Sequence, residues 1–148
     1  MQANIRQATV ADHQRLETLQ RLASLATREH RQALLDNPEV FGIAAENIAH
    51  SLVAELDGHV VGFCTVLPVS ADLAEVDAIF IDPDAWREGI GRMLLTAAEQ
   101  RAAVVGTKAL VVTSSGQAVS FYRALGFQPA SVSMTDFGPA ERLTKQLA

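Results

Sequence analysis

The sequence is poor in cysteine and in large aromatic residues, with one cysteine, one tryptophan and one tyrosine among 148 residues. A single cysteine, Cys64, excludes an intrachain disulfide and a cysteine-rich zinc site. No apolar run approaches the roughly 20 residues that a membrane-spanning helix requires. The first residues also lack the apolar core of a secretory signal, so a reducing cytoplasm is the expected location.

Positive charge is also scarce. Charged residues make up 20% of the chain, and the net charge is -5 at pH 7. A nucleic-acid-binding surface requires a basic face, so this class of partner is not expected. The excess of acid favours a cationic partner such as an amine. The length and the 49% hydrophobic content predict one soluble domain over residues 1–148, without linkers or repeats.

The hydrophobic pattern changes along the chain from helical spacing to alternation. Helical spacing predicts a first helix from a Thr9–Asp12 capping box to about Thr27, and a shorter one before Pro38. From Ser51 the alternation predicts a β-hairpin around Asp57-Gly58. The later predicted elements are strands over 74–81 and 109–112, helices over 89–106 and 116–126, and two final strands. This order predicts an α/β (α+β) fold, a mixed sheet with helices on both faces.

The segment between Ile79 and Leu95 carries the most information about function. An apolar strand leads through Pro83 into a helix that opens on Gly89-Ile90-Gly91. Backbone N–H groups at a helix start have no partner within the helix, and the helix dipole places positive charge there. Glycine lets an anion approach these groups. The turn predicts a phosphate or pyrophosphate site, although Gly-x-Gly also occurs in tight turns that bind nothing.

Neither common nucleotide motif explains this turn. A dinucleotide-binding fold would add a third glycine and an acidic residue about twenty positions further on. A P-loop would add Gly-Lys-Ser/Thr. The sequence contains neither pattern at this turn.

Two carboxylates precede the glycine turn on the predicted strand. Glu75 and Asp77 are two residues apart, so both are expected on one face of the strand with Ile79 and Ile81. A carboxylate among apolar neighbours can have a raised pKa and act as a general base near neutral pH. The alternative is a pair of solvated charges at a wet strand end, and both interpretations stay open at this point.

Other residue types that often carry chemistry give weaker signals. Tyr122 lies on an apolar helical stripe and is either a core aromatic or a proton donor at the edge of the helix. Cys64 has no histidine placed to activate it. The four histidines are not at ligand spacing, so no metal site is predicted. Ser114-Ser115-Gly116 lacks the Gly-x-Ser-x-Gly elbow of hydrolases and indicates a helix cap.

Together, these blocks resemble the GNAT superfamily of acyl-CoA-dependent N-acyltransferases. The similarity includes the acid-bearing segment 74–83, the glycine turn 86–91, and residues 118–127, which are similar to the family pattern Ala-x-x-x-Tyr-x-x-x-Gly-Phe. The blocks occur in the family's order over nearly the whole chain. The resemblance implies a single GNAT domain with a mixed, mostly antiparallel sheet of about six or seven strands.

The resemblance also assigns roles to individual residues. It implies that the co-substrate acetyl-CoA binds with its pyrophosphate on the amides of residues 87–92 and its pantetheine arm along residues 79–81. Glu75 matches the base that deprotonates an amine, Asp77 is the second candidate, and Tyr122 matches the acid that protonates the leaving CoA thiolate. The residues implied at the cofactor are Ile79, Phe80, Ile81, Trp86, Arg87, Glu88, Gly89, Ile90, Gly91, Arg92 and Ser115.

The sequence departs from the family pattern in two places. Trp86 stands where the turn usually has Gln or Arg, which weakens one side-chain contact to the phosphates. Ser114-Ser115-Gly116 replaces an asparagine that is common ahead of the last helix, so a cofactor contact at Ser115 stays open.

The resemblance implies an N-acetyltransferase in which a primary amine attacks acetyl-CoA directly, without a covalent enzyme intermediate. Two alternatives remain, an acyl-CoA-binding sensor or interaction module of the same fold and a nucleotide-binding fold. The acceptor, a small-molecule or peptide amine, and the length of the acyl group are not fixed. A homodimer is expected from the resemblance alone, and neither nucleic acid nor membrane is an expected partner.

Overall fold

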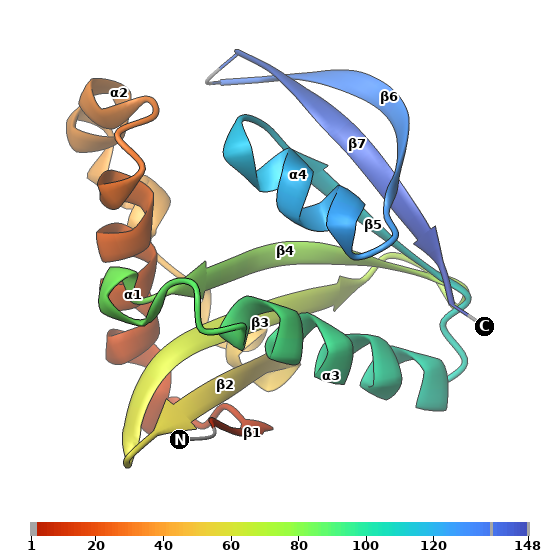
Figure 1. Ribbon diagram of the computed structural model, residues 1–148, viewed down its shortest axis with the longest axis horizontal. Coiled ribbons are helices and arrows are strands. Elements are labelled where there is room, and N and C mark those ends of the chain that lie inside the picture. Colours follow the sequence, from red (N-terminus) through yellow and green to blue (C-terminus); the bar gives the residue numbers. More distant parts are fainter. Residues whose placement is uncertain (1–2, 137, 148) are drawn as a thin grey trace. The chain divides into compact units, whose positions relative to one another are not determined.

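A computed structural model of the protein describes residues 3–136 and 138–147 (Figure 1). The strands are β1 (Asn4–Gln7), β2 (Ser51–Leu56), β3 (His59–Pro68), β4 (Leu73–Ile81), β5 (Ala109–Ser114), β6 (Gln128–Thr135) and β7 (Gly138–Gln146). The α-helices are α1 (His13–Ala26), α2 (Arg31–Asp36), α3 (Ile90–Val104) and α4 (Gln117–Ala124). Short 3-10 helices are η1 (Val10–Asp12), η2 (Pro38–Phe41), η3 (Ala45–His50) and η4 (Pro83–Ala85).

The strands form one seven-stranded sheet in the order β1-β2-β3-β4-β5-β7-β6. Strands β4 and β5 pair in parallel. The pairs β1–β2, β2–β3, β5–β7 and β6–β7 run antiparallel. The predicted fold class, a mixed and mostly antiparallel sheet combined with helices, is therefore confirmed.

Internal contacts divide the chain into two compact units. The first comprises Met1–Val66 and Ala78–Ala98, and the second comprises Leu67–Asp77 and Glu99–Ala148. Elements β3, β4 and α3 each contribute residues to both units. The single domain over residues 1–148 stays a prediction.

The core of the first unit joins α1 to the β2–β3 hairpin. Leu16 and Leu19 of α1 are fully buried, as are Val53 of β2 and Phe63 of β3. The Phe80 side chain of β4 packs against this cluster. The spacing of the buried leucines agrees with the helical periodicity on which the first predicted helix depends.

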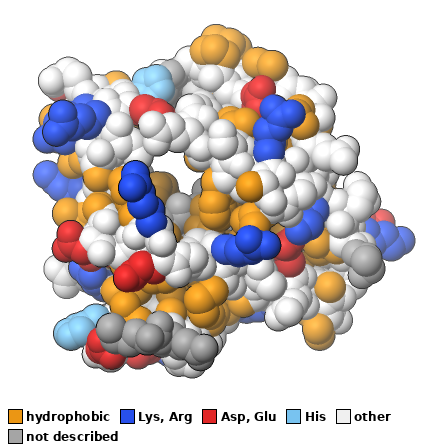
Figure 2. Space-filling view, viewed as in Figure 1, with side chains coloured by type: hydrophobic (Ala, Val, Ile, Leu, Met, Phe, Trp, Pro, Cys, Tyr) orange, Lys and Arg blue, Asp and Glu red, His pale blue; other side chains and the backbone are white. Residues whose placement is uncertain are grey.

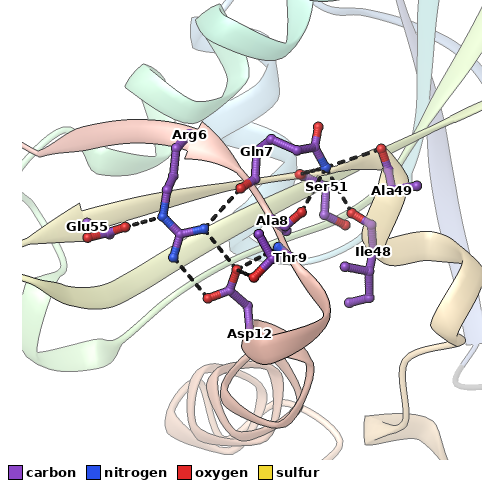
Figure 3. Close-up of polar contacts among 9 residues, drawn as sticks. All are labelled: Arg6, Gln7, Ala8, Thr9, Asp12, Ile48, Ala49, Ser51 and Glu55. Carbon is purple, nitrogen blue, oxygen red and sulfur yellow. Dashed lines mark hydrogen bonds and ion pairs between the residues drawn. The ribbon is translucent and has the colours of Figure 1, made fainter.

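A polar network holds together the start of the first unit (Figure 3). The Arg6 guanidinium donates two hydrogen bonds of 2.9 Å to the Asp12 carboxylate and also pairs with Glu55. Asp12 accepts a 2.7 Å hydrogen bond from the Thr9 backbone N–H, as the predicted capping box requires. Asp12 is 8% exposed, and its hydrogen bonds with Arg6 lower its pKa to about 2. The network connects β1, η1 and β2.

The second unit has its own apolar core. Leu110 and Val112 of β5 are buried, and so is Leu143 of β7. Tyr122 of α4 is also buried, with its ring centroid 5.5 Å from that of Phe127. The strand register places Val112 opposite Leu143, so neighbouring strands bring these apolar side chains together.

Two local predictions were wrong. Ser114 and Ser115 do not cap the last helix: Ser114 ends β5, and the residue before α4 is Gly116, with φ 61° and no capping side chain. The hydrophobic spacing of the helix after Gly89 predicts one apolar face that includes Ile90, Met93 and Leu94, but Met93 is 38% exposed, whereas Leu95 is fully buried. One error concerns the residue that caps a helix and the other concerns the residues that a helix buries. The helices themselves were predicted.

On the face shown in Figure 2, the Lys and Arg side chains lie interspersed with Asp and Glu. Within residues 3–136 and 138–147, none of the helices combines the length and apolar character needed to cross a membrane.

Candidate active site

The glycine turn lies in the first unit, where β4 passes through η4 into α3. Arg87 and Gly89 both adopt left-handed backbone conformations, with φ of 68° and 78°. Left-handed residues in such turns let successive N–H groups converge on an anion. A Cβ added at Gly89 would meet no heavy atom within 4 Å, so this side of the turn is open.

The start of α3 provides the main-chain donors. Helix geometry leaves the N–H groups of Ile90, Gly91 and Arg92 without acceptors inside the helix. The next N–H, that of Met93, donates to the Gly89 carbonyl at 3.0 Å. The Ile90 side chain is buried and anchors the helix start in the core. This arrangement suits an anion, because the open donors lie at the positive end of the helix dipole.

An arginine that sequence reasoning missed holds the turn from α1. Arg15 donates to the Val60 carbonyl at 3.0 Å and to the Asp82 carboxylate at 3.2 Å. The other oxygen of Asp82 accepts from the Asp84 N–H at 2.9 Å and caps η4. A lone arginine on a helix gives no signal in the sequence, because its partners come from distant strands.

Trp86 has a structural role where the family pattern has Gln or Arg. Its indole Nε1 donates to the Ile81 carbonyl at 2.8 Å. The bond ties the turn back to the end of β4. The substitution thus replaces a side chain that could reach a phosphate with one that supports the turn backbone.

The predicted acid pair lies in the second unit, on β4. Glu75 is half-buried and Asp77 is exposed, whereas the residues that alternate with them, Ala74 and Val76, are buried. This places both carboxylates on one side of the strand. The alternation stops there, because residues 78–81 are all half-buried, so burial does not extend that side to Ile79 and Ile81. Desolvation raises the pKa of Asp77, although its exposure limits the effect.

A second arginine that sequence reasoning missed lies beside Glu75. Arg142 Nη1 of β7 is 3.9 Å from Glu75 Oε2 and donates to Thr113 Oγ1 at 3.1 Å. The register explains the contact, since Glu75 pairs with Val111 and Arg142 pairs with Thr113. The Arg142 and Glu75 side chains are 38% and 36% exposed, so this ion pair contributes little to stability.

Tyr122 and Ser115 also lie in the second unit, in different surroundings. Tyr122 is 5% exposed, and its ring packs edge-on against Phe121 and Phe127. This packing agrees with the core-aromatic interpretation, and the role of Tyr122 as an acid stays a prediction. Ser115 is exposed and lines a pocket at the start of α4.

Cys64 is buried inside β3, and this burial raises the pKa of its thiol to about 12. A thiol in this state is not a nucleophile near neutral pH, which agrees with its interpretation as a small apolar core residue. No group of three or more His, Cys, Asp or Glu side chains in the described part of the chain could hold a metal ion.

Comparisons with known proteins identify acetyltransferases as the relatives of this chain. The model of the acetyltransferase (GNAT) family matches residues 13–127. An amino-acid acetyltransferase of Azotobacter vinelandii is 30% identical over 91 residues, which are 61% of this chain and 21% of that protein. Peptidyl-lysine N-acetyltransferase YjaB of Salmonella typhimurium is 41% identical over 61 residues, which are 41% of each protein. The chain thus spans less than two thirds of the length of these relatives.

A solved structure has the same fold over 99% of the chain. The PaiA N-acetyltransferase of Thermoplasma acidophilum, in complex with coenzyme A, matches with a TM-score of 0.81 and 21% identity, covering 99% of each chain. The family model covers more than half of this chain, including the glycine turn, the acid pair and Tyr122. The chain therefore belongs to the acetyltransferase (GNAT) family.

Proposed function

We propose that the protein is an N-acetyltransferase that transfers the acetyl group of acetyl-CoA to a primary amine. The observation that carries this proposal is the turn before α3, where the left-handed Arg87 and Gly89 precede three N–H groups without helical acceptors and the space beside Gly89 is open. Coenzyme A carries a diphosphate, the kind of group that such a helix start binds. Membership of the family supports the acyl transfer.

The second unit supplies the candidate acid and base. Glu75 accepts a proton from the amine, with Asp77 as the second candidate. The amine nitrogen then bonds to the thioester carbonyl carbon, the carbon–sulfur bond breaks, and Tyr122 protonates the departing sulfur. Arg142, held by Thr113, restrains the Glu75 carboxylate on its side of the strand. The buried Cys64 thiol, whose pKa is raised to about 12, is not a candidate nucleophile, and in this proposal the amine attacks the thioester directly.

A second candidate is a module of the same fold that binds acyl-CoA without turnover. The observation in its favour is the close packing of Tyr122, whose ring contacts two phenylalanine rings edge-on and which is only 5% exposed. A phenol that is packed in this way acts as a core residue. It can protonate a leaving thiolate only if its hydroxyl group reaches the sulfur.

The two candidates are separated by measuring binding and turnover on the same preparation. Calorimetry with coenzyme A is expected to detect binding under both. Release of free thiol from acetyl-CoA, followed over a panel of small amines and amine-bearing peptides, is expected only of the enzyme. Binding without thiol release on any amine would favour the module. An absence of heat at millimolar coenzyme A would contradict both, and stabilisation by ATP or NAD would then favour the nucleotide-binding fold.

The glycine turn has a matched control elsewhere in the first unit. Gly89 has φ 78° and Gly58 has φ 80°, and an added Cβ meets nothing within 4 Å at either position. Replacement by Ala therefore imposes a similar backbone strain at each site. Gly89→Ala is expected to weaken coenzyme A binding about tenfold or more, whereas Gly58→Ala changes it less than about twofold. Equal affinities in both variants would contradict the assignment of the diphosphate to this turn.

A further inference from the structure

Asp82 holds the corner at which β4 passes into η4. Its N–H donates to the Val61 carbonyl at 2.8 Å, and its carbonyl accepts from the Ala85 N–H at 2.8 Å. One oxygen of its carboxylate accepts from the Asp84 N–H at 2.9 Å. The other accepts from Arg15 Nη2 at 3.2 Å. The corner is therefore tied to β3, to η4 and to α1.

Arg15 makes a two-point contact from α1. Its Nε donates to the Val60 carbonyl of β3 at 3.0 Å while Nη2 reaches Asp82. Because the guanidinium is planar and its donors are fixed, the bond to the carbonyl restrains the direction in which Nη2 meets the carboxylate. The Arg15 and Asp82 side chains are 38% and 18% exposed. An ion pair with this exposure adds little to overall stability, so its loss changes the local conformation more than the free energy of unfolding.

The corner sets the position of the anion-binding donors. It leads through η4 into the turn with the left-handed Arg87 and Gly89, and the N–H groups that open α3 follow directly. A left-handed arginine is unfavourable by itself and persists only where the surrounding structure holds it. A corner that is free to move would populate conformations in which the donors no longer converge. Only the fraction of molecules with the donors in place binds the anion, so the apparent affinity falls with that fraction.

We propose that Arg15 is a positioning residue for the co-substrate, which keeps the turn before α3 in its diphosphate-binding conformation by holding Asp82. This inference rests on the proposed function, because the ligand at the turn is coenzyme A. Arg15 lies in the first unit, whereas the candidate acid and bases lie in the second. Arg15 therefore affects the binding of the co-substrate and not the chemical step.

The test compares Arg15→Met with Arg21→Met in the full chain. Arg21 also lies on α1, but its Cζ is 5.8 Å from the centroid of the Phe41 ring in η2. Both replacements remove one positive charge from the same helix, and only the first removes the contact with the corner. By calorimetry, coenzyme A affinity is expected to fall about fivefold in Arg15→Met and less than about twofold in Arg21→Met. Urea unfolding of each variant establishes that folded proteins are compared.

Steady-state kinetics separate positioning from a general loss of structure. Arg15→Met is expected to raise the KM for acetyl-CoA about fivefold and to leave kcat within about twofold, because saturating co-substrate restores the binding conformation. Arg15→Lys keeps the charge without the fork of donors and is expected to recover part of the affinity. A lower kcat at unchanged KM would mean that fewer molecules are active, and would overturn the proposal.

Asp82→Asn tests whether Arg15 acts through the carboxylate. Asparagine keeps an acceptor for the Asp84 N–H but lacks the charge that Arg15 binds. In this background Arg15→Met is expected to change coenzyme A affinity less than about twofold. A full loss in both backgrounds, or parental affinity in a folded Arg15→Met protein, would refute the inference and leave the proposed function intact. A parent protein that binds no coenzyme A would contradict the proposed function, and the inference with it.

Discussion

At the scale of single residues, the two carboxylates of β4 differ in their surroundings. Glu75 is half-buried beside Arg142, whereas Asp77 is exposed and its pKa is raised by partial desolvation. Their spacing alone could not separate them as candidate bases. Because the two carboxylates have different surroundings, replacing each one separately and comparing the loss of kcat shows which of them is the base.

Replacing Glu75 by Gln removes a proton acceptor and keeps the shape of the side chain. We expect Glu75→Gln to lower kcat about 100-fold and to leave coenzyme A affinity within about twofold, whereas Asp77→Asn lowers kcat less than about fivefold. Steady-state kinetics and calorimetry measure the two effects. If Asp77 is the base, the order is reversed. The acid limb of the pH–rate profile then lies above the ordinary aspartate range, because the pKa of Asp77 is raised, and Asp77→Asn removes it.

The ion pair of Asp12 with Arg6 is expected to make the stability of the fold depend on pH. Its pKa is lowered from 3.8 to about 2 in the folded protein by Arg6, so the ionised form is favoured by folding. The stabilisation is present above the unfolded pKa and is lost as the pH falls through the folded pKa. It amounts to about 2 kcal/mol. The free energy of unfolding in urea should therefore fall between about pH 4 and pH 2 in the parent protein.

Asp12→Asn should be less stable than the parent at neutral pH. Its free energy of unfolding should also fall less between about pH 4 and pH 2, because the titrating carboxyl group is gone. Asp57→Asn is the matched control, because Asp57 is exposed and its left-handed φ of 53° suits Asn. Parallel acid profiles for the parent and Asp12→Asn would show that the Arg6 network contributes nothing measurable.

At the scale of secondary-structure elements, close approach at Gly62 joins β3, β4 and α3 within the first unit. A Cβ at this position would lie 2.6 Å from Ile81 Cδ1 and 3.3 Å from Leu94 Cδ1. Leu94 is fully buried, so it has little room to move. We expect Gly62→Ala to reduce the free energy of unfolding by about 1–3 kcal/mol in urea titrations.

The same contact offers a rescue. Ile81→Val deletes the Cδ1 atom nearest to the added Cβ, so the double variant should recover part of the loss. A double-mutant cycle without coupling would mean that the cost arises from the backbone of β3 and not from this packing.

The elements also show what the sequence could specify. The hairpin at Asp57-Gly58 was predicted because two adjacent residues, an Asp and a Gly, favour the left-handed turn, in which their φ angles are 53° and 80°. The cap of α4 was not, because Ser114 is drawn into β5 by its pairing with Glu141. Arg142 was missed for a similar reason: only the register of β5 and β7 brings it beside Glu75. Local chemistry is readable in the sequence, whereas partners set by strand register are not.

At the scale of the whole molecule, the acidic balance bears on the acceptor. The chain has 17 acidic and 12 basic side chains. Attraction of a cation by this net charge is screened by salt. We expect the KM for a diamine to rise severalfold between about 20 and about 300 mM NaCl, and that for a zwitterionic amino acid to change less than about twofold. Initial-rate measurements over this range test the expectation, and identical salt dependence for both acceptors would contradict it.

The burial of Cys64 has a practical consequence for assays of the whole molecule. Because the sole sulfhydryl of the chain is sealed inside β3, folded protein should remain colourless with an aromatic disulfide reagent until denaturant opens it. Yellow colour in a native reaction mixture then reports product alone, and the slow appearance of one equivalent per chain would time the opening of the strand itself.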